Sequence, residues 1–594
     1  MNHSYPVYTK ETECQDCYKC VRRCPVKAIR VRDGHATVIP ELCVACGRCV
    51  EVCPAKAKRV RDDMGRARLL VQGGDKVYVS LAPSWVSEFK NVTAPQMIHA
   101  LRQLGFAGVS ETALGAQLVS AAVGKSLDHM KKGVIISSAC PTAVDYICKY
   151  IPPFARTITQ VVSPVMAHCR LLREKFGADI KVVFIGPCIA KKNESDRHPE
   201  VLNLAMTYPE LCRWFEEAGI NPETQVPEAT DVYVPDRAEE GAIYPIEGGM
   251  IETVKACTAN DKVSYATVTG LDNLARALDG LWPENVNAPV FLEVLACPGG
   301  CVHGPCTRHD SPGLLERLRV LNSVKMPERT PERAIAADIS EHFQEEPVKE
   351  EPISLRDLKA ALRRIGKFTP EDELNCGGCG YETCKNFARA LITGTAEPSM
   401  CVSYLKKQAQ KKANALLRCI PSGVVIADKN LNIIECNRKF AATFGEDSLA
   451  AFEACPGLAG ADLRRIVPFG NLFEASLKSG NDLQRDAFKV NRRLYNLTIF
   501  NIEPHEVVGA VIFDVTQTEM RREQIAERAR KVIEKNLTTV QEIACRLGEN
   551  MADTELLLRS IADDYADDNM LDDKTVEDRG AGNSKTSTGE GHHE

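Results

Sequence analysis

The sequence has no long apolar stretch. No run reaches the roughly 18 apolar residues that a membrane-spanning helix needs, and the first residues, MNHSYPVYTKETEC, lack the apolar core of a secretory signal. Charge of either sign is also not in excess, since the net charge is -6 over 594 residues, and nothing indicates nucleic-acid binding. These absences predict a cytoplasmic protein with no membrane or nucleic-acid partner. The length predicts three to five domains.

Cysteine, in contrast, is abundant and clustered. The chain has 25 cysteines, with eight between Cys14 and Cys53 and four between Cys376 and Cys401. In a long cytosolic chain, clustered cysteines indicate metal binding rather than disulfides. Exposed cluster thiolates are readily oxidised, so we expect an anaerobic or micro-oxic host.

Residues 1–62 contain the pattern C-x2-C-x2-C-x3-C-P twice. This pattern is typical of bacterial ferredoxins, in which the fourth cysteine of each run ligates the other of two [4Fe–4S] clusters. The predicted ligands are Cys14, Cys17, Cys20 and Cys53 for one cluster, and Cys43, Cys46, Cys49 and Cys24 for the other. A pair of zinc knuckles is the alternative, but zinc sites rarely carry three evenly spaced cysteines and a Cys-Pro step.

Residues 75–330 alternate short apolar runs with helical patterns, which predicts parallel strands buried on both faces. The predicted strands are 76–83, 133–140, 181–188 and 289–297, and the predicted helices between them include 94–105 and 141–151. Three of the strands end in a cysteine, at Cys140, Cys188 and Cys297. Ligands bind at the carboxyl ends of parallel strands. These thiols and nearby Cys301 are therefore predicted to converge on a [4Fe–4S] cluster or a tetrahedral zinc site.

The loops around these cysteines resemble those of a known family. SSACPTA (137–143), GPCIAKKNE (186–194) and EVLACPGGC (293–301) are similar, in order and spacing, to the three signature loops of [FeFe]-hydrogenases. APS (82–84) and GGM (248–250) also resemble family elements. A coincidental set of core cysteines is the alternative, but three ordered motifs behind a double ferredoxin pattern argue against it.

The resemblance implies an H-cluster, in which a [4Fe–4S] cube is joined through a cysteine to a di-iron unit that carries CO, cyanide and a dithiolate amine. The implied ligands of the cube are Cys140, Cys188, Cys297 and Cys301, the last of which bridges to the di-iron unit. Lys191 would donate a hydrogen bond to one cyanide. The other cyanide would be served by Ser84 and by the backbone near Ala82 and Pro83. A solvated surface lysine is the alternative interpretation of Lys191, and adjacent Lys192 suits that role better.

The chain departs from the hydrogen-producing members of the family along the path of protons. In those enzymes a cysteine before the first-loop ligand passes protons to the bridging amine, whereas this chain has Ala139. In those enzymes an upstream helix supplies carboxylates, whereas the corresponding stretch 121–126 of this chain has none. The methionines that are usual in loops two and three are replaced by Gly186 and Leu295. Positioned proton-transfer groups contribute roughly 10²–10⁴ in rate, so we expect slow turnover with H2 binding intact.

The end of the third loop differs as well. VHGPC (302–306) replaces the family's glycine-rich tail. His303 or Cys306 is a candidate for a substitute proton path, and packing or a turn position is an equal alternative for each.

Downstream, an acidic, proline-interrupted linker at 331–354 is predicted to be extended and solvated. Residues 355–405 begin with an amphipathic helix at 355–366. The domain then carries four predicted cluster ligands, Cys376, Cys379, Cys384 and Cys401. Their spacing and intervening glycines resemble a small [4Fe–4S] domain of several redox proteins, with a zinc site as the alternative.

The last third of the chain resembles a signalling module. Residues 408–520 resemble a PAS domain, with strands at 420–428, 431–437, 492–503 and 507–516 and a helix at 438–445; an unrelated α+β domain is the alternative. Apolar residues at three-four spacing predict a signalling helix over 521–562 that forms a homodimer seam or a docking face. The acidic, polar tail at 563–594 is predicted to be disordered.

The predicted fold class is multidomain: an α+β double-cluster ferredoxin domain, an α/β H-cluster domain, a small [4Fe–4S] domain, an α+β PAS domain and a C-terminal helix. One function is H2 sensing, in which the protein binds or slowly oxidises H2 and relays the redox state through [4Fe–4S] clusters to PAS and on to a kinase or phosphatase. A second is a catalytic hydrogenase that exchanges electrons with a partner such as ferredoxin and uses PAS for docking. A cluster carrier without a di-iron unit is the third, but the PAS domain and terminal helix do not suit it. Ala139 and the missing carboxylates favour sensing.

Overall fold

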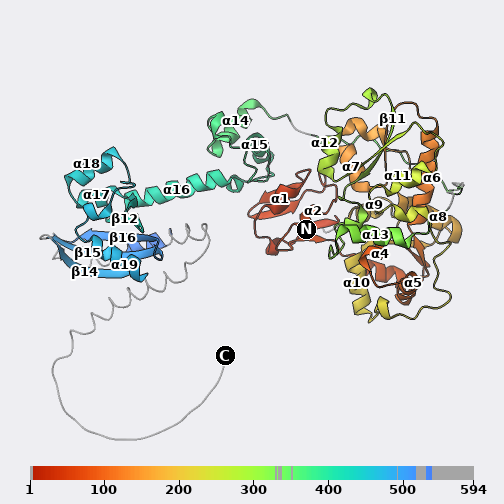
Figure 1. Cartoon of the computed structure of the whole chain (residues 1–594), viewed down its shortest axis with the longest axis horizontal. Coiled ribbons are helices and arrows are strands. Elements are labelled where there is room, and N and C mark those ends of the chain that lie inside the picture. Colours follow the sequence, from red (N-terminus) through yellow and green to blue (C-terminus); the bar gives the residue numbers. More distant parts are fainter. Residues whose placement is uncertain are drawn as a thin grey trace, which may run out of the picture. The chain divides into compact units, whose positions relative to one another are not determined.

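The computed structural model of the chain describes residues 5–327, 331, 333, 337–349, 352–490, 493–516, 530–537 and 539. These residues divide into two compact units, Met1–Val402 and Ser403–Glu594, whose elements are labelled in Figure 1. None of the helices in the described part is both long enough and apolar enough to cross a membrane.

The N-terminal segment is built from two similar halves. Its elements are the antiparallel pair β1 (Val7–Thr9) and β4 (Lys58–Val60), the antiparallel pair β2 (Ile29–Arg32) and β3 (His35–Val38), and the short helices α1 (Lys19–Arg23) and α2 (Arg48–Glu51). The backbone has positive φ at equivalent points of the two halves: Asp16 and Ala45, Tyr18 and Gly47, and Lys27 and Lys56. Such left-handed turns let successive amide groups surround an anionic centre, as in many Fe–S sites.

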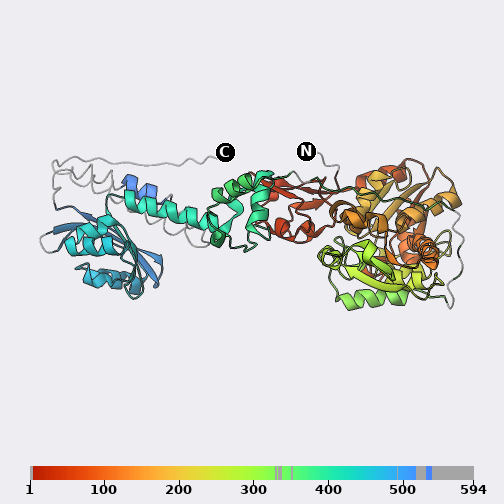
Figure 2. The same cartoon turned by 90° about the horizontal axis from the view of Figure 1, so that it is seen from above.

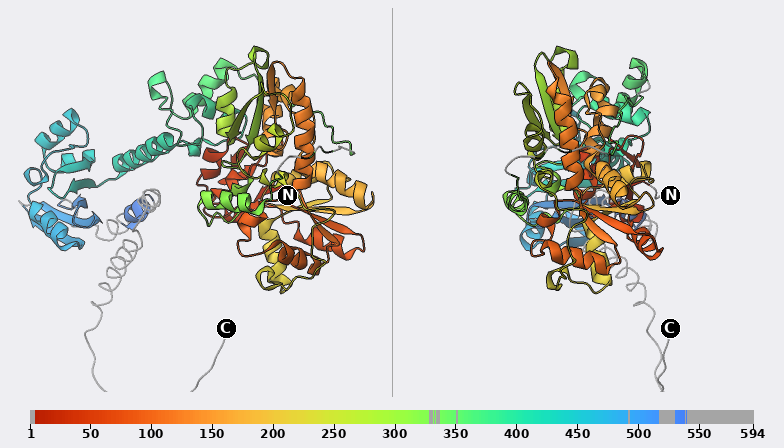
Figure 3. Two further views of the ribbon diagram at one scale, coloured as in Figure 1. Left: turned by 45° about the vertical axis from the view of Figure 1, so that its right-hand side comes forward. Right: turned by 90° about the vertical axis from the view of Figure 1, so that its right-hand side faces the viewer.

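Two parallel sheets form the core of residues 75–327. The first has the order β6-β5-β8-β9, with β5 (Val77–Leu81), β6 (Gly108–Glu111), β8 (Lys181–Gly186) and β9 (Leu204–Thr207). The second has the order β10-β11-β7, with β7 (Gly133–Ile136), β10 (Ser264–Thr269) and β11 (Pro289–Leu295). The predicted strands are present and parallel. The sequence did not predict β6, β9 or β10, nor the division into two sheets that Figure 3 shows from two directions.

Helices cover both faces of the four-stranded sheet. On one face lie α3 (Met64–Gln72), α5 (Ala94–Gln103) and α10 (Tyr208–Glu217), and on the other lie α6 (Ala113–Asp128) and α8 (Pro164–Phe176). Helix α5 begins at a capping box made by Thr93 and Gln96, and its residues Met97 and Leu101 are one turn apart and fully buried. This apolar stripe holds α5 against the sheet.

The three-stranded sheet packs against its own helices. These are α7 (Pro141–Tyr150), α11 (Gly249–Lys255) and α12 (Leu271–Leu278). Val144, Leu274 and Val294 meet in the core between α7, α12 and β11. The remaining helices of this region are α4 (Trp85–Glu88), α9 (Ala190–Arg197) and α13 (Gly313–Ser323).

Glu111, at the end of β6, is a buried carboxyl that accepts a hydrogen bond from the amide of Ala238 at 2.7 Å. Burial raises the pKa of Glu111 to about 7. At pH values between the ordinary glutamate pKa and about 7, Glu111 is ionised in the unfolded chain but protonated in the folded chain. The folded state therefore loses stability as the pH rises through this window. We expect Glu111→Gln to stabilise the fold by about 2–3 kcal/mol at about pH 8 and by little at about pH 5. Denaturant midpoints at both pH values measure this difference, and an equal shift at the two would contradict it.

The predicted linker is extended, but it is not free in solution. Ile339 is buried, and the amides of Glu341 and Glu346 bond to the carbonyls of Gln160 and Cys148 at 3.2 and 3.0 Å. Most side chains of 341–349 are exposed, and Ile339, just before them, packs in the apolar core that contains α8. The chain then enters α14 (Leu355–Arg364) and α15 (Cys384–Ile392).

The second unit contains a five-stranded antiparallel sheet of order β13-β12-β16-β15-β14. Its strands are β12 (Gly423–Asp428), β13 (Ile433–Cys436), β14 (Leu483–Val490), β15 (Arg493–Glu503) and β16 (Val507–Asp514), with helices α16 (Val402–Cys419), α17 (Arg438–Thr443), α18 (Glu446–Ala454) and α19 (Gly470–Ser479). Asn437 caps α17 by accepting from the amide of Phe440 at 2.8 Å. Strand β14 was not predicted. Of the predicted helix 521–562, only 530–537 and 539 are described, and they are helical; the tail 563–594 lies outside the described residues.

Candidate metal centre

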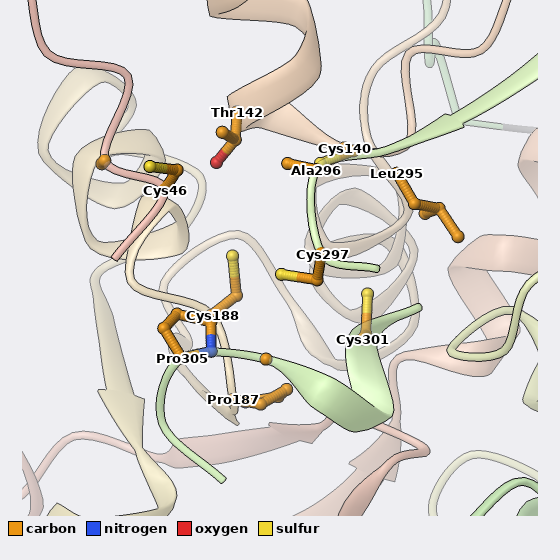
Figure 4. Close-up of a pocket in the computed structure, with 12 residues that line it drawn as sticks. Cys46, Cys140, Thr142, Pro187, Cys188, Leu295, Ala296, Cys297, Cys301 and Pro305 are labelled. Carbon is orange, nitrogen blue, oxygen red and sulfur yellow. The ribbon is translucent and has the colours of Figure 1, made fainter. Parts of the chain in front are cut away.

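Four cysteines line one pocket at the carboxyl ends of the two sheets. Cys140 follows β7 and caps α7, Cys188 follows β8, and Cys297 and Cys301 lie in the turn after β11. In Figure 4 the sulfur atoms of Cys188, Cys297 and Cys301 point toward the space between them. That space measures about 380 Å³ when its opening to solvent is counted. The structure thus brings together the four cysteines that the strand ends predicted.

The turn after β11 depends on glycine. Gly299 and Gly300 have positive φ, 78° and 104°. A Cβ on Gly300 would lie 2.3 Å from the carbonyl oxygen of Pro245, so no larger residue fits. This close approach turns the chain sharply enough for Cys297 and Cys301 to line the same pocket.

The four thiols are buried beside one another, which makes them poor acids until a metal neutralises them. Burial, followed by nearby Cys140, raises the pKa of Cys188 to about 11, and Lys191 opposes the rise. Burial and the three neighbouring thiols raise the pKa of Cys297 further. Within the described residues, no three His, Cys, Asp or Glu side chains are grouped so that they could hold a single ion. Four thiols in one pocket suit either a [4Fe–4S] cluster or a tetrahedral zinc ion.

Lys191 lies beside this pocket and is already paired. Its ammonium group donates to Glu194 Oε2 at 2.6 Å and to Ser163 Oγ at 3.0 Å, and it is mostly buried. Lys192, which we predicted to be the solvated lysine, is fully buried between Asp63 and Glu210, 2.9 Å from each. That prediction was wrong, because two carboxylates far from Lys192 in the sequence neutralise its charge.

Ser84 is fully buried, and its hydroxyl shares a 2.7 Å hydrogen bond with the phenol of Tyr208. Ala82 is buried, Pro83 is half-buried, and the amide of Ala82 donates to Ile185 O at 2.9 Å. None of these residues lines the pocket as the cysteines do. Tyr208, which the sequence did not single out, holds the Ser84 hydroxyl.

Ala139 precedes Cys140 and carries no ionisable group. Its amide donates to Ser137 Oγ at 3.1 Å, and Ser137 Oγ lies 3.0 Å from the sulfur of Met250. The methyl side chain of Ala139 packs against the apolar core around α6 and α8. No proton donor therefore occupies this position.

Two further differences from the expected pattern have local causes. A Cβ on Gly186 would lie 2.5 Å from the ring of Phe184, so this aromatic ring fills the space that a longer side chain at 186 would need. On α6, Ser120 shares hydrogen bonds with Tyr244 at 2.6 Å and Thr253 at 2.7 Å. A buried hydroxyl cluster thus lies next to the stretch 121–126 that has no carboxylates.

Comparison with known proteins agrees with this geometry. Residues 75–305 match the family "Iron only hydrogenase large subunit, C-terminal domain". They form an iron-only hydrogenase domain. Residues 6–54 match a 4Fe-4S dicluster domain, 372–403 a putative Fe-S cluster and 412–484 a PAS domain. The chain is therefore a hydrogenase-like iron–sulfur protein with a PAS domain.

The relatives of the hydrogenase domain are themselves hydrogenases. The periplasmic [Fe] hydrogenase large subunit of Nitratidesulfovibrio vulgaris is 27% identical over 376 residues, which cover 52% of this chain and 88% of that protein. Iron hydrogenase 1 of Clostridium pasteurianum is 24% identical over 313 residues, 43% of this chain and about half (54%) of its own length. A solved [FeFe]-hydrogenase of Chlamydomonas reinhardtii is 18% identical, with 48% of this chain and 100% of that chain covered at a TM-score of 0.38.

His303 and Cys306 lie outside the pocket of the hydrogenase domain. His303 Nε2 is 3.0 Å from the buried carboxylate of Glu316 on α13. Cys306 is buried, and its amide donates to Pro187 O at 3.2 Å. Both side chains are thus packed in the turn that follows Cys301.

A buried glutamate supports the third loop of the hydrogenase domain. Glu293, on β11, is 1% exposed and accepts from the amides of Gly248 and Met250 at 2.8 and 3.0 Å and from the hydroxyl of Thr267 at 2.9 Å. Burial raises its pKa. Glu293 therefore ties the GGM segment to the strand that leads into Cys297.

Cys24 of the ferredoxin segment is surrounded by cysteines of the second run, as the crossed pattern predicts for one of the two clusters. Burial raises the pKa of Cys46 to about 12, and the thiols of Cys24 and Cys43 add to the rise. Burial, followed by the thiols of Cys46, Cys43 and Cys24, likewise raises the pKa of Cys49. Cys24, from the first run, thus lies with the cysteines of the second. Cys46 also lines the pocket of the hydrogenase domain, so the two cysteine sites adjoin.

The last cysteine set is held together by the loops of its own small domain. The amide of Cys384 donates to Asn375 Oδ1 at 2.8 Å. A Cβ on Gly378 would lie 3.7 Å from Cys376 Sγ and 3.4 Å from Val402, the residue after Cys401. These contacts bring the segments that contain all four cysteines to one end of the domain.

Proposed function

We propose that this protein senses H2: it binds or slowly oxidises H2 at an H-cluster and passes the redox state through [4Fe–4S] clusters to its PAS domain. Ala139 is the observation that carries the proposal. It directly precedes the pocket cysteine Cys140, and its packed methyl group cannot deliver a proton. A protein that holds H2 without rapid proton exchange is suited to reporting H2 rather than consuming it.

The residues around the pocket fit the group that the family binds. Cys140, Cys188, Cys297 and Cys301 would hold the cubane part, with Cys301 bridging to the di-iron part. When bound, the H-cluster supplies the iron centre at which H2 is split. Lys191, held in place by Glu194 and Ser163, provides a buried positive charge beside the anionic cluster. The hydroxyl of Ser84 is held in place by its hydrogen bond with the phenol of Tyr208.

The other modules supply the route away from the H-cluster. The ferredoxin segment would carry two [4Fe–4S] clusters on its eight cysteines, and residues 355–405 a further cluster on Cys376, Cys379, Cys384 and Cys401. Cys46 lines the hydrogenase pocket, which supports electron transfer from that pocket into the ferredoxin segment. The PAS domain is the readout, and a homodimer that acts on a kinase or phosphatase would complete the pathway.

A catalytic hydrogenase that exchanges electrons with ferredoxin is the second candidate. The complete set of four pocket cysteines and the hydrogenases among its relatives favour it. In that case the PAS domain would serve for docking.

Infrared spectroscopy of the matured protein tests the proposal. We expect bands of iron-bound CO and cyanide that shift when H2 is added, together with slow H2 turnover. Cys301→Ser is expected to abolish the bands, because it removes the thiolate that joins the two parts of the cluster. The matched control is Cys306→Ser, a buried cysteine of the same turn outside the pocket, which should keep them. Absent bands in the wild-type protein, or bands that do not respond to H2, would refute the sensing function.

A further inference from the structure

The two halves of the ferredoxin segment present equivalent surfaces to two different neighbours. On the second half, Cys46 lines the hydrogenase pocket, and adjacent Gly47 packs so closely on Pro305 that an added Cβ would lie 2.3 Å from it. Position 47 therefore needs glycine both for this contact and for its positive φ of 79°. Cys17 and Tyr18 are the corresponding residues of the first half, so the equivalent surface there lies around Cys17.

The small cysteine domain contacts the first half beside that equivalent surface, on which Cys17 stays exposed. Arg22 on α1 donates to the carbonyl of Cys17 at 2.9 Å and to the carbonyl of Gly378 at 3.4 Å. One guanidinium thus connects a ferredoxin cysteine to the residue that precedes Cys379. Next to it, a Cβ on Gly380 would lie 2.7 Å from Val21 Cγ1. Val21 follows Cys20 in the sequence, and Gly380 follows Cys379. The cysteine loop of the ferredoxin segment therefore contacts the cysteine loop of the small domain.

The contact extends along the edge of the ferredoxin segment. The amide of Val31 donates to Thr395 O at 2.9 Å, and the amide of Asp33 donates to Glu397 Oε1 at 2.7 Å. Figure 2 shows the small domain, with α14 and α15 in green, alongside the red N-terminal segment. Backbone amides that bond across an interface fix its register, so this is a docked face rather than a chance approach.

We propose that the small domain is the built-in electron acceptor of the ferredoxin segment, and that electrons leave the cluster on Cys14, Cys17, Cys20 and Cys53 for the centre on Cys376, Cys379, Cys384 and Cys401. The inference deepens the proposed function and rests on it. In each transfer the ferredoxin cluster is oxidised by one electron and the acceptor cluster is reduced by one; H2 oxidation supplies two electrons and releases two protons. The contacts at Val21, Arg22, Val31 and Asp33 hold the small domain next to this cluster, while Cys17 itself stays exposed. They give the electron a route that remains on the chain.

Electron paramagnetic resonance of the fully reduced, cluster-loaded chain tests the route. Reduction with dithionite makes the readout independent of H2 and of the di-iron unit. We expect magnetic interaction between the first ferredoxin cluster and the small-domain cluster. Gly380→Val should abolish that interaction and leave the iron content unchanged, because its side chain collides with Val21. Gly394→Ala is the matched control: Gly394 has positive φ in the same domain, but an added Cβ meets nothing within 4 Å, so the interaction should persist.

Hydrogen exchange provides a second readout. In the docked chain the amides of Val31 and Asp33 should exchange slowly, and Gly380→Val should release both. Slow exchange without magnetic interaction would overturn the electron route while leaving the docking intact. Fast exchange of both amides in the unmodified chain would overturn the docking itself. Failure of the sensing function would appear in the infrared experiment instead and would leave these two measurements unaffected.

Discussion

Ala139→Cys is expected to raise the rate of H2 turnover by roughly 10²–10⁴-fold, the contribution that a positioned proton-transfer group commonly makes. The residue follows Ser138 in the loop after β7 and directly precedes Cys140, one of the four pocket cysteines. A thiol there would supply the proton donor that the present methyl group lacks. The measurement is H2 oxidation with an artificial electron acceptor, alongside infrared spectra that show equal cluster loading in both proteins.

Ala139→Ser is the matched control, because a hydroxyl of nearly the same size does not ionise near neutral pH. It should leave turnover far below that of the cysteine variant. If the unmodified protein already turns over H2 as fast as Ala139→Cys does, slow proton delivery is not its defining property, and the catalytic function becomes the better explanation.

Lys192→Met is expected to destabilise the hydrogenase region by about 3–5 kcal/mol, the usual consequence of removing one partner from a buried ion pair. Lys192 and Asp63 are both fully buried, and Glu210 is nearly so. Burial alone would raise the pKa of Asp63, but Lys192 and Arg61 outweigh it and hold that pKa below its ordinary value. Without the ammonium group, buried Glu210 loses its ion pair with Lys192, and Asp63 keeps only Arg61 and Arg66. Denaturant unfolding of the full chain measures the loss.

Lys10→Met provides the comparison, since Lys10 forms an exposed pair with Glu13 and should change stability by less than about 1 kcal/mol. Combining Lys192→Met with Asp63→Asn and Glu210→Gln removes the stranded charges and should restore part of the loss. A Lys192→Met protein as stable as the Lys10→Met protein would contradict the buried-network interpretation.

Cysteine spacing and apolar runs predicted much of this molecule, since both depend on neighbours in the sequence. The strand ends at Cys140, Cys188 and Cys297 were readable because fully buried parallel strands are continuous apolar runs. Strand β10 was not predicted from the sequence, because its residues SYATVT lie at a sheet edge and two of them are exposed. β6, GVSE, was missed because it is short and ends in polar residues that are buried only by tertiary contacts.

The site residues show the same limit. Lys192 next to Lys191 indicated a solvated charge, since Asp63, its partner, is 129 positions away in the sequence. The contact between Arg22 and Gly378 spans 356 positions and has no local signature. Cysteine positions are thus set by local spacing, whereas charge partners and module contacts are set by the tertiary fold.

The pocket draws its cysteines from both sheets of the hydrogenase region, with Cys188 from the four-stranded sheet and the other three from the three-stranded sheet. A cluster bound there would cross-link the two sheets, which also share an apolar core that contains Phe291 of β11 and Phe184 of β8. The free energy of cluster binding then becomes free energy of association between the sheets. Loss of iron would remove this cross-link and leave the shared apolar core to hold the sheets together. Cluster occupancy is therefore expected to contribute to the stability of the hydrogenase region.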